Sequence, residues 1–317
     1  MDIETLTQFI KAKAIALGFD ACGIARAERL EEDEYRLQQW LSKGYHAGMQ
    51  WMANHVDKRI NPQLLFEGTR SIVVVLKNYA PAHYPFANRK YKIARYALGV
   101  DYHRVMKKQL QRLLYEIQQT FGNHIRGRCF VDSAPVMERT WAQRAGLGWI
   151  GKNSLLLNRR LGSYFFIGEI FLDIELAYDK PINNLCGTCT YCIDACPTGA
   201  IVAPMVIDAS RCISYQTIEN KNDIDEPVKG KLQGWIFGCD ICQEVCPWNF
   251  RANPHHEPAF EASPALKELT DEQLENLTEE SYSCLFARSP VKRAKYPKLL
   301  HNIRINQKYS LKASKVN

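Results

Sequence analysis

The chain has 317 residues, of which 46% are hydrophobic and 24% are charged. A chain of this length is too long to fold around one small hydrophobic core, and we expect two domains with a short tail. The first residues carry acids and no long apolar core, which argues against a signal peptide, and no apolar run reaches the roughly 20 residues that span a bilayer. We therefore expect a cytoplasmic protein without a membrane partner, in which eleven cysteines favour metal ligation over disulfides.

The net charge of +7 is concentrated near the C-terminus. No acidic residue follows Glu280, whereas nine basic residues do: Arg288, Lys292, Arg293, Lys295, Lys298, Arg304, Lys308, Lys312 and Lys315. A basic segment attached to a nearly neutral body is typical of a protein that binds a polyanion. A solvated, partly disordered C-terminus would show the same composition, so charge alone leaves both interpretations open.

The first half of the chain predicts a mixture of helices and strands. Apolar residues at helical spacing predict a helix over residues 4–17, which ends before Gly18. Short apolar runs predict strands over residues 71–76 and 128–132.

Residues 133–146 predict a helix, with Ser133 as its cap, Pro135 in its first turn and Gly146 at its end. Asp132 then lies where a strand meets a helix, and we single it out as a candidate catalytic acid. The alternative is an acid that only stabilises the helix dipole. A helix N-terminus lowers the pKa of a carboxyl, so a proton donor here would need burial or an electron-rich cofactor to raise it.

Residues 153–158 and 163–176 predict two strands, and the turn at residues 159–162 predicts that they form a hairpin. Residues 146–152 (GLGWIGK) satisfy the glycine spacing of a dinucleotide loop and nearly that of a P-loop. Both of those sites need a strand before the loop and a helix after it, and the order predicted here is the reverse. We therefore do not expect a nucleotide site, and the alternative is a glycine turn that packs closely against a bulky cofactor.

The cysteines form two groups with ferredoxin spacing. The first is Cys186-x2-Cys189-x2-Cys192-x3-Cys196-Pro197, in which the fourth cysteine of the pattern ligates a second cluster. The second is Cys239-x2-Cys242-x3-Cys246-Pro247, for which Cys212 is the nearest additional ligand. The crossed pattern predicts two 4Fe–4S clusters, one bound by Cys186, Cys189, Cys192 and Cys246 and the other by Cys196, Cys212, Cys239 and Cys242. Paired zinc knuckles fit this spacing poorly.

The three remaining cysteines, Cys22, Cys129 and Cys284, are expected to be ordinary buried residues. Residues 265–306 predict two or three short helices that carry the basic charge, with segments at 264–269, 270–277 and 289–303. The overall expectation is an α+β fold in three parts: a mixed α/β domain at 1–176, a ferredoxin-like double-cluster domain at 177–255, and a short basic helical segment at 256–317.

Four segments together resemble the epoxyqueuosine reductase family: residues 93–106, 131–158, 186–201 and 238–249. The resemblance covers most of residues 1–300. It implies a cobalamin-dependent iron–sulfur enzyme that reduces the epoxide of epoxyqueuosine in tRNA to a cyclopentene, the last step of queuosine synthesis. The 1–176 domain would then bind cobalamin, and the clusters would pass electrons singly to cobalt.

The resemblance also implies roles for individual residues. Asp132 would donate a proton to the opened epoxide oxygen. The residues that line the corrin would be Arg95, Tyr96, Tyr102, His103, Lys152, Asn153 and Asp240. Residues 101–106 are close to the D-x-H-x-x-G motif of histidine-ligated cobalamin proteins but lack its glycine, so His103 is expected to be a polar neighbour and not a cobalt ligand.

The same resemblance implies that the basic segment binds tRNA. The tRNA phosphates would meet Lys292, Arg293, Lys295, Lys298 and Arg304 while the modified base is splayed into a pocket. Electrons would come from an external low-potential donor of the flavodoxin or ferredoxin type, and we expect a monomer. The alternatives are a reductive dehalogenase-like cobalamin enzyme, which would need no basic segment, and a ferredoxin-type electron carrier, which would leave some 180 residues without a purpose.

Overall fold

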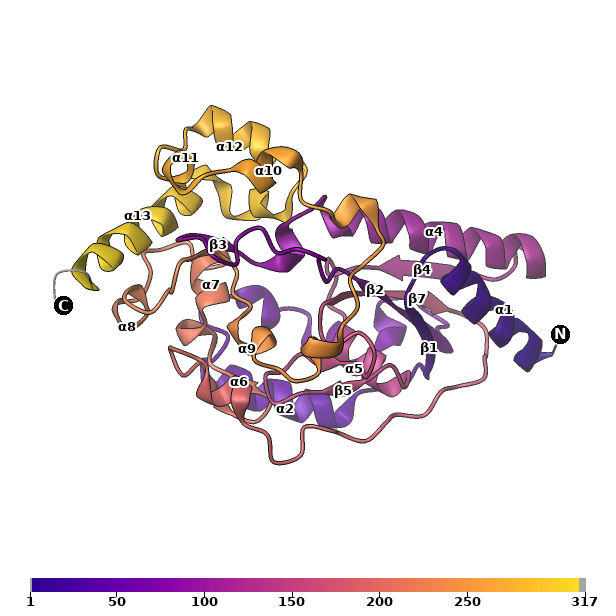
Figure 1. The fold of residues 1–317 in the computed structure, drawn as a ribbon. Coiled ribbons are helices and arrows are strands. Elements are labelled where there is room, and N and C mark those ends of the chain that lie inside the picture. Colours follow the sequence, from indigo (N-terminus) through magenta and orange to yellow (C-terminus); the bar gives the residue numbers. More distant parts are fainter. Residues whose placement is uncertain (1, 314–317) are drawn as a thin grey trace.

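The computed structural model describes residues 2–313, with side chains described as far as Tyr309 (Figure 1). Its main sheet has four strands in the order β1-β2-β7-β4, and every neighbouring pair is antiparallel. The strands are β1 (Ala21–Arg26), β2 (Ser71–Asn78), β7 (Phe165–Leu172) and β4 (Gly127–Phe130). The mixed helix and sheet content confirms the predicted α+β class.

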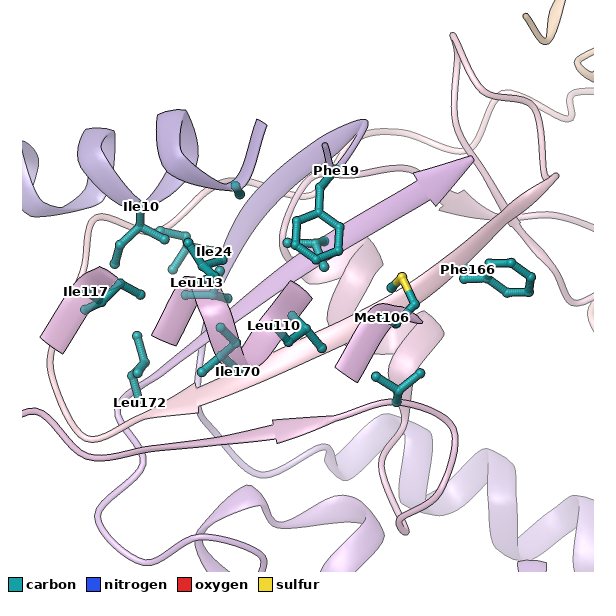
Figure 2. Packing of buried hydrophobic residues seen from close by; sticks show 14 of the residues in the cluster. Ile10, Phe19, Ile24, Met106, Leu110, Leu113, Ile117, Phe166, Ile170 and Leu172 are labelled. Atoms are coloured by element: carbon teal, nitrogen blue, oxygen red, sulfur yellow. The ribbon is translucent and has the colours of Figure 1, made fainter. Parts of the chain in front are cut away.

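Helices cover both faces of this sheet. On one face lie α1 (Ile3–Ala16) and the long α4 (Tyr102–Phe121). Figure 2 shows how α4 packs every third or fourth residue against β7, through Met106, Leu110, Leu113, Ile117, Ile170 and Leu172. The opposite face is covered by α5 (Glu138–Arg144), whose Trp141 and Ala142 pack with Phe165 and Phe171 of β7. Because α4 and α5 both begin near the end of β4, their first turns flank the same edge of the sheet.

The predicted helix over 133–146 begins later than expected, at Glu138, and Ser133 does not cap it. The preceding strand also ends early, at Phe130. Pro135 disfavours helical backbone at the residue before it, and Asp132 adopts a left-handed conformation with a φ of +44°. Residues 131–137 are therefore a loop, and Asp132 lies on this loop instead of at a helix N-terminus.

The predicted hairpin is wrong in its pairing. Strand β6 (Leu156–Leu157) pairs with β5 (Trp149–Ile150), while β7 joins the main sheet between β2 and β4. Only an isolated bridge between Asn158 and Gly162 closes the turn. Gly148 explains the glycine motif, because a Cβ there would lie 2.1 Å from the carbonyl oxygen of Leu157. The glycine motif thus lets two backbone segments approach closely. A helix precedes the loop and a strand follows it, which is the reverse of the order around a nucleotide-binding loop.

The cysteine-rich region follows a long extended segment. Its elements are short: α6 (Tyr191–Asp194), β8 (Ile201–Ala203), β9 (Val206–Ile207), α7 (Ile213–Ile218), α8 (Glu226–Lys229), β10 (Trp235–Phe237) and α9 (Ile241–Glu244). Strand β10 pairs in parallel with β3 (Lys92–Ile93), so residues from the first part of the chain continue into this region. The other helices of the first part are α2 (Glu31–Ser42) and α3 (Val56–Ile60).

The C-terminal segment contains more helices than predicted: α10 (Pro264–Glu268), α11 (Asp271–Glu275), α12 (Glu279–Leu285) and α13 (Lys295–Ala313). Short 3-10 turns complete the described structure, at Gln50–Met52, Pro62–Leu64, Arg95–Ala97, Ala209–Arg211, Asn249–Arg251, Pro258–Phe260 and Pro290–Ala294. Helix α13 packs on β10 through buried residues, and its Asn302 donates to the carbonyls of Thr217 and Ile236. The described part of the basic segment is therefore folded, whereas Lys315 lies outside the described residues.

Within residues 2–313, no helix combines the length and the apolar character that a bilayer crossing requires.

Candidate functional site

The predicted cysteine sets gather as two neighbouring groups. The thiol of Cys192 interacts electrostatically with those of Cys186, Cys189 and Cys246. Cys246 and Cys186 also share one apolar cluster with Trp149 and Leu157. Cys246 of the second motif therefore lies near three cysteines of the first motif.

The second group has the same character. Cys242 interacts electrostatically with Cys212 and Cys196, and Cys239 interacts with Cys212 and Cys242. Cys242 also interacts with Cys192 of the first group, so the two sets are adjacent. No three potential ligands in the described part of the chain converge closely enough for one ion, but a 4Fe–4S cubane needs only one thiolate at each of four irons. Eight thiols in two adjacent groups are a donor set that fits two such clusters.

The loops around the cysteines are fixed by residues from the first part of the chain. The ammonium of Lys152 donates to the carbonyl oxygens of Gly187 and Cys189, each at 2.8 Å. The amide of Asn153 lies 3.4 Å from the carbonyl oxygen of Cys242. In the conformation described, these two side chains hold the cysteine loops and do not face open space.

Arg95 fixes the loop of the second cysteine motif. Its backbone N–H donates to Asp240 at 2.8 Å, and its guanidinium bonds Asp240 at 3.1 Å and Glu244 at 2.6 Å. Asp240 is only 2% exposed, and burial raises its pKa to about 6 although Arg95 works in the opposite direction. Tyr96 follows Arg95 and interacts electrostatically with both Asp240 and Asp132, so it lies between the cysteine loop and the end of the sheet.

Asp132 lies just past the end of β4, where the first turns of α4 and α5 meet. The hydroxyl of Tyr102 donates a hydrogen bond to Oδ2 of Asp132, and Nε2 of His103 lies 3.6 Å from the same oxygen. The Tyr102 ring stacks on Phe166 of β7 with centroids 4.1 Å apart, which fixes the position of its hydroxyl. The Asp132 side chain nevertheless remains 57% exposed. Tyr102 and His103 therefore hold the carboxylate of Asp132 on one side, and its other side is accessible to solvent.

Hydrogen bonds decide the charges at this site. Burial alone would raise the pKa of Asp132, but the bonds from His103 and Tyr102 hold it below its ordinary value. Burial opposes the charged form of His103, yet the bonds to Asp101 and Asp132 raise its pKa to about 9. At neutral pH the pair is thus an imidazolium beside a carboxylate. The structure lowers the pKa of Asp132 through its side-chain partners and not through a helix dipole.

Two acidic residues near Asp132 were not predicted from the sequence. Glu138 accepts a hydrogen bond from the backbone N–H of Asp132, and Glu169 lies fully buried on β7. An acid inside the apolar run of residues 163–172 is an unusual feature of a fully buried strand, and it was the signal that could have identified Glu169.

Of the basic residues predicted to contact a polyanion, some have exposed side chains and others already bond neighbouring residues of the protein. Lys292, Lys295 and Arg304 are exposed. Arg293 pairs with Glu219 and interacts electrostatically with Asp132, which places this part of the basic segment beside the site. Lys298 is half-buried and donates to the carbonyl of Asn222.

One expectation for the remaining cysteines is wrong, because Cys284 is exposed on α12. Cys22 and Cys129 are partly buried, and burial raises the pKa of each thiol to about 12. Neither thiol is therefore a nucleophile at neutral pH.

Comparison with known proteins agrees with this geometry. Residues 185–249 match the family model of the 4Fe-4S double cluster binding domain, and residues 59–133 match that of "Epoxyqueuosine reductase QueG, DUF1730". The epoxyqueuosine reductase of Leadbetterella byssophila is 52% identical over 93% of this chain and 96% of its own length. That of Cellulophaga algicola is 49% identical over 95% and 97%.

Solved structures of the same enzyme share the fold. A crystal structure of epoxyqueuosine reductase with an epoxyqueuosine-modified tRNA-Tyr stem loop is 28% identical, with a TM-score of 0.88, covering 99% of this chain and 84% of that one. The Bacillus subtilis enzyme, with its catalytic aspartate loop swung out of the active site, gives a TM-score of 0.89 at 28% identity, with the same coverage. From its sequence, its double-cluster domain and its fold, the chain belongs to the epoxyqueuosine reductase family of oxidoreductases.

Proposed function

We propose that this chain reduces epoxyqueuosine to queuosine at the wobble position of tRNA, with cobalamin fed by the two clusters. The observation that carries the proposal is Asp132. Its carboxylate is accessible and contacts Tyr102 and His103, and Tyr96 interacts electrostatically both with it and with Asp240 of the second cysteine motif. The presence of a catalytic aspartate loop in the related Bacillus subtilis enzyme supports this choice.

The reaction requires two electrons and two protons, since an epoxide becomes an alkene and water. The two adjacent cysteine groups would hold the clusters, which would supply the electrons one at a time. The first proton comes from the His103–Asp132 pair. Because the pKa of His103 is about 9, this pair holds a proton at neutral pH, and Asp132 presents it to the developing negative charge on oxygen.

The residues around the site fit a cobalamin. The ring of Tyr96 is partly exposed and lies 6.4 Å from that of Tyr102, so it can offer apolar surface to a corrin. The buried hydroxyl of Ser154 has no hydrogen-bond partner in the described structure and suits a corrin amide. When bound, reduced cobalamin supplies a strong nucleophile or reductant towards a strained C–O bond.

The predicted corrin-lining residues divide accordingly. Tyr96 and His103 are partly exposed near Asp132 and would contact the cofactor directly, whereas the buried Tyr102 would position Asp132 from beneath. The contacts of the other four, Arg95, Lys152, Asn153 and Asp240, run to the cysteine loops, so they would hold those loops against it. Both ring nitrogens of His103 are engaged, Nδ1 by Asp101 at 2.7 Å and Nε2 by Asp132, so His103 would be a polar neighbour of the cofactor and not a metal ligand.

The basic segment would receive the tRNA. Exposed Lys292, Lys295 and Arg304 can meet phosphates, and Arg293 connects that surface to Asp132. The solved relative with a bound tRNA stem loop supports a nucleic-acid partner. We further propose that the enzyme acts as a monomer in the cytoplasm and takes electrons from an external flavodoxin or ferredoxin.

An anaerobic assay tests the proposal. The protein is reconstituted with iron, sulfide and cobalamin, supplied with a low-potential reductant and epoxyqueuosine-containing tRNA, and the nucleosides are read by mass spectrometry. We expect the modified base to lose one oxygen, and Asp132→Asn to abolish this loss while the cofactor spectra stay intact. No conversion by wild-type protein with both clusters and cobalamin demonstrably bound would contradict the proposed function.

A further inference from the structure

Two carboxyl groups lie behind Asp132 and have no role in the reaction as described so far. Oε1 of Glu138 accepts the backbone N–H of Asp132 at 2.5 Å. Glu169 lies on β7 directly opposite Phe130, the last residue of β4, two positions before Asp132. Electrostatic interactions connect Glu169 to both other acids. Three carboxyl groups are thus gathered at one end of the sheet.

Glu169 lies in an apolar environment. It shares its sheet face with Phe165 and Phe171, the face that α5 covers, and its register partners are Val74 and Phe130. It is 0% exposed, and neither of its carboxyl oxygens has a hydrogen-bond partner in the described residues. A buried carboxylate without a partner is too costly to keep ionised, so Glu169 is a neutral acid, and burial raises its pKa well above the ordinary value.

Glu138 lies between this neutral acid and the site. The charged groups that face it are Asp132 on the loop, Arg139 on its own helix and His103 on α4. Burial and the negative charge of Asp132 raise the pKa of Glu138 to about 8, against the opposing effects of Arg139 and His103. At neutral pH Glu138 therefore carries a proton directly beside the backbone of Asp132.

We propose that Glu138 is the second acid of the reaction, and that Glu169 stays neutral behind it and takes no part in proton transfer. This inference rests on the proposed function. The His103–Asp132 pair gives the first proton to the opened epoxide oxygen. Glu138 then returns a proton to Asp132, directly or through one water, and Asp132 delivers it to the same oxygen.

The protons and electrons then balance. Two electrons arrive from the clusters, both C–O bonds of the epoxide break, the C=C bond forms, and the oxygen leaves as water with two protons. Solvent reprotonates Glu138 and His103 after release of the product. Without Glu138 the second proton would have to come from bulk water, past a bound tRNA.

The experiment compares Glu138→Gln, Glu169→Gln and Glu138→Ala. Glutamine at 138 can still accept the Asp132 N–H but cannot supply a proton, so it separates proton transfer from positioning. Glutamine at 169 matches a neutral glutamic acid in shape and charge and serves as the control. The first measurement is infrared titration of the protonated-carboxyl band in cluster-loaded protein without substrate. We expect one band that is lost in Glu138→Gln and titrates near pH 8, and one that is lost in Glu169→Gln and does not titrate.

The second measurement is single-turnover conversion as a function of pH in fully loaded enzyme. We expect Glu138→Gln to be about 100-fold slower at pH 7 and to lose the decline near pH 8, and Glu169→Gln to stay within a few-fold of wild type. A wild-type rate in Glu138→Gln, alone or beside an impaired Glu138→Ala, overturns the proposal and leaves only a positioning role. Absence of the titrating band also overturns the proposal for Glu138. If the wild-type enzyme never converts tRNA, that result contradicts the proposed function and not the role of Glu138.

Discussion

Nε2 of His103 lies 3.6 Å from Oδ2 of Asp132, while its Nδ1 bonds Asp101 at 2.7 Å. One imidazole thus joins the N-cap of α4 to the loop after β4. Both neighbours are carboxylates, so the ring is charged at neutral pH. The charge that holds Asp132 in its ionised form also helps to hold the loop against the sheet.

This arrangement predicts how stability depends on pH. The pKa of His103 is about 9 in the folded protein and about 6.5 when unfolded, so its stabilisation is complete below pH 6.5 and is lost as pH rises towards 9. Because the ring is 37% exposed, solvent screening limits the effect to about 1 kcal/mol or less. Denaturant unfolding of wild type and His103→Gln at pH 6 and pH 9 checks this. The two proteins should differ in stability at pH 6 and converge at pH 9, and an equal difference at both would contradict it.

Arg95→Met should remove the cation that keeps Asp240 and Glu244 in place. Asp240 is buried, so it is left without its charged partner, at a cost of about 3 kcal/mol or more. Since Asp240 lies between Cys239 and Ile241, the second cluster should be lost first. Unfolding curves and iron content measure the two effects. Arg160→Met, at an exposed position, is the matched control and should change neither quantity.

Cys246→Ser and Cys196→Ser test the crossed ligation. In the crossed assignment, Cys246 ligates the first cluster although it lies in the second motif, and Cys196 ligates the second cluster although it lies in the first. Cys246→Ser should therefore disrupt the first cluster, and Cys196→Ser the second. Low-temperature EPR of the reduced proteins, together with Cys189→Ser and Cys239→Ser as references, identifies the cluster that is affected. If Cys246→Ser instead resembled Cys239→Ser, the local assignment would be correct and the crossed one wrong.

Replacing Lys292, Lys295 and Arg304 by glutamine should weaken tRNA binding without changing the cofactors. Each lost phosphate contact lowers the slope of log affinity against log salt by about 0.7 to 0.9. Binding measured between 50 and 200 mM salt, a range over which phosphate contacts are strongly screened, gives that slope. Lys108→Gln, at an exposed position on α4, is the control. An unchanged slope in the triple variant would place the tRNA elsewhere on the protein.

Much of the chemistry was readable from local spacing. The two cysteine motifs indicate two clusters because three of the ligands in each motif lie within a few residues of one another, whereas the crossed sets also need partners that are distant in the sequence and remain a prediction. Helix α1 was predicted because its apolar residues recur at helical spacing, and strand β2 because it is a short continuous apolar run, as expected of a strand buried on both faces. Helix α4 was missed although its buried residues, Met106, Leu110, Leu113 and Ile117, recur at helical spacing.

Other features depend on partners distant in the sequence. The apolar pattern of β7 could not show that its neighbours are β2 and β4 and not β6, because both edges of a fully buried strand look alike in sequence. Loop 131–137 replaced the first turn of a helix because Asp132 gains bonds to Tyr102 and Glu138 there. The protonation of the site is likewise a tertiary property. Asp132, Glu138 and Glu169 are ordinary acids in the sequence, and only folding brings them together at one end of the sheet, where their charges influence one another.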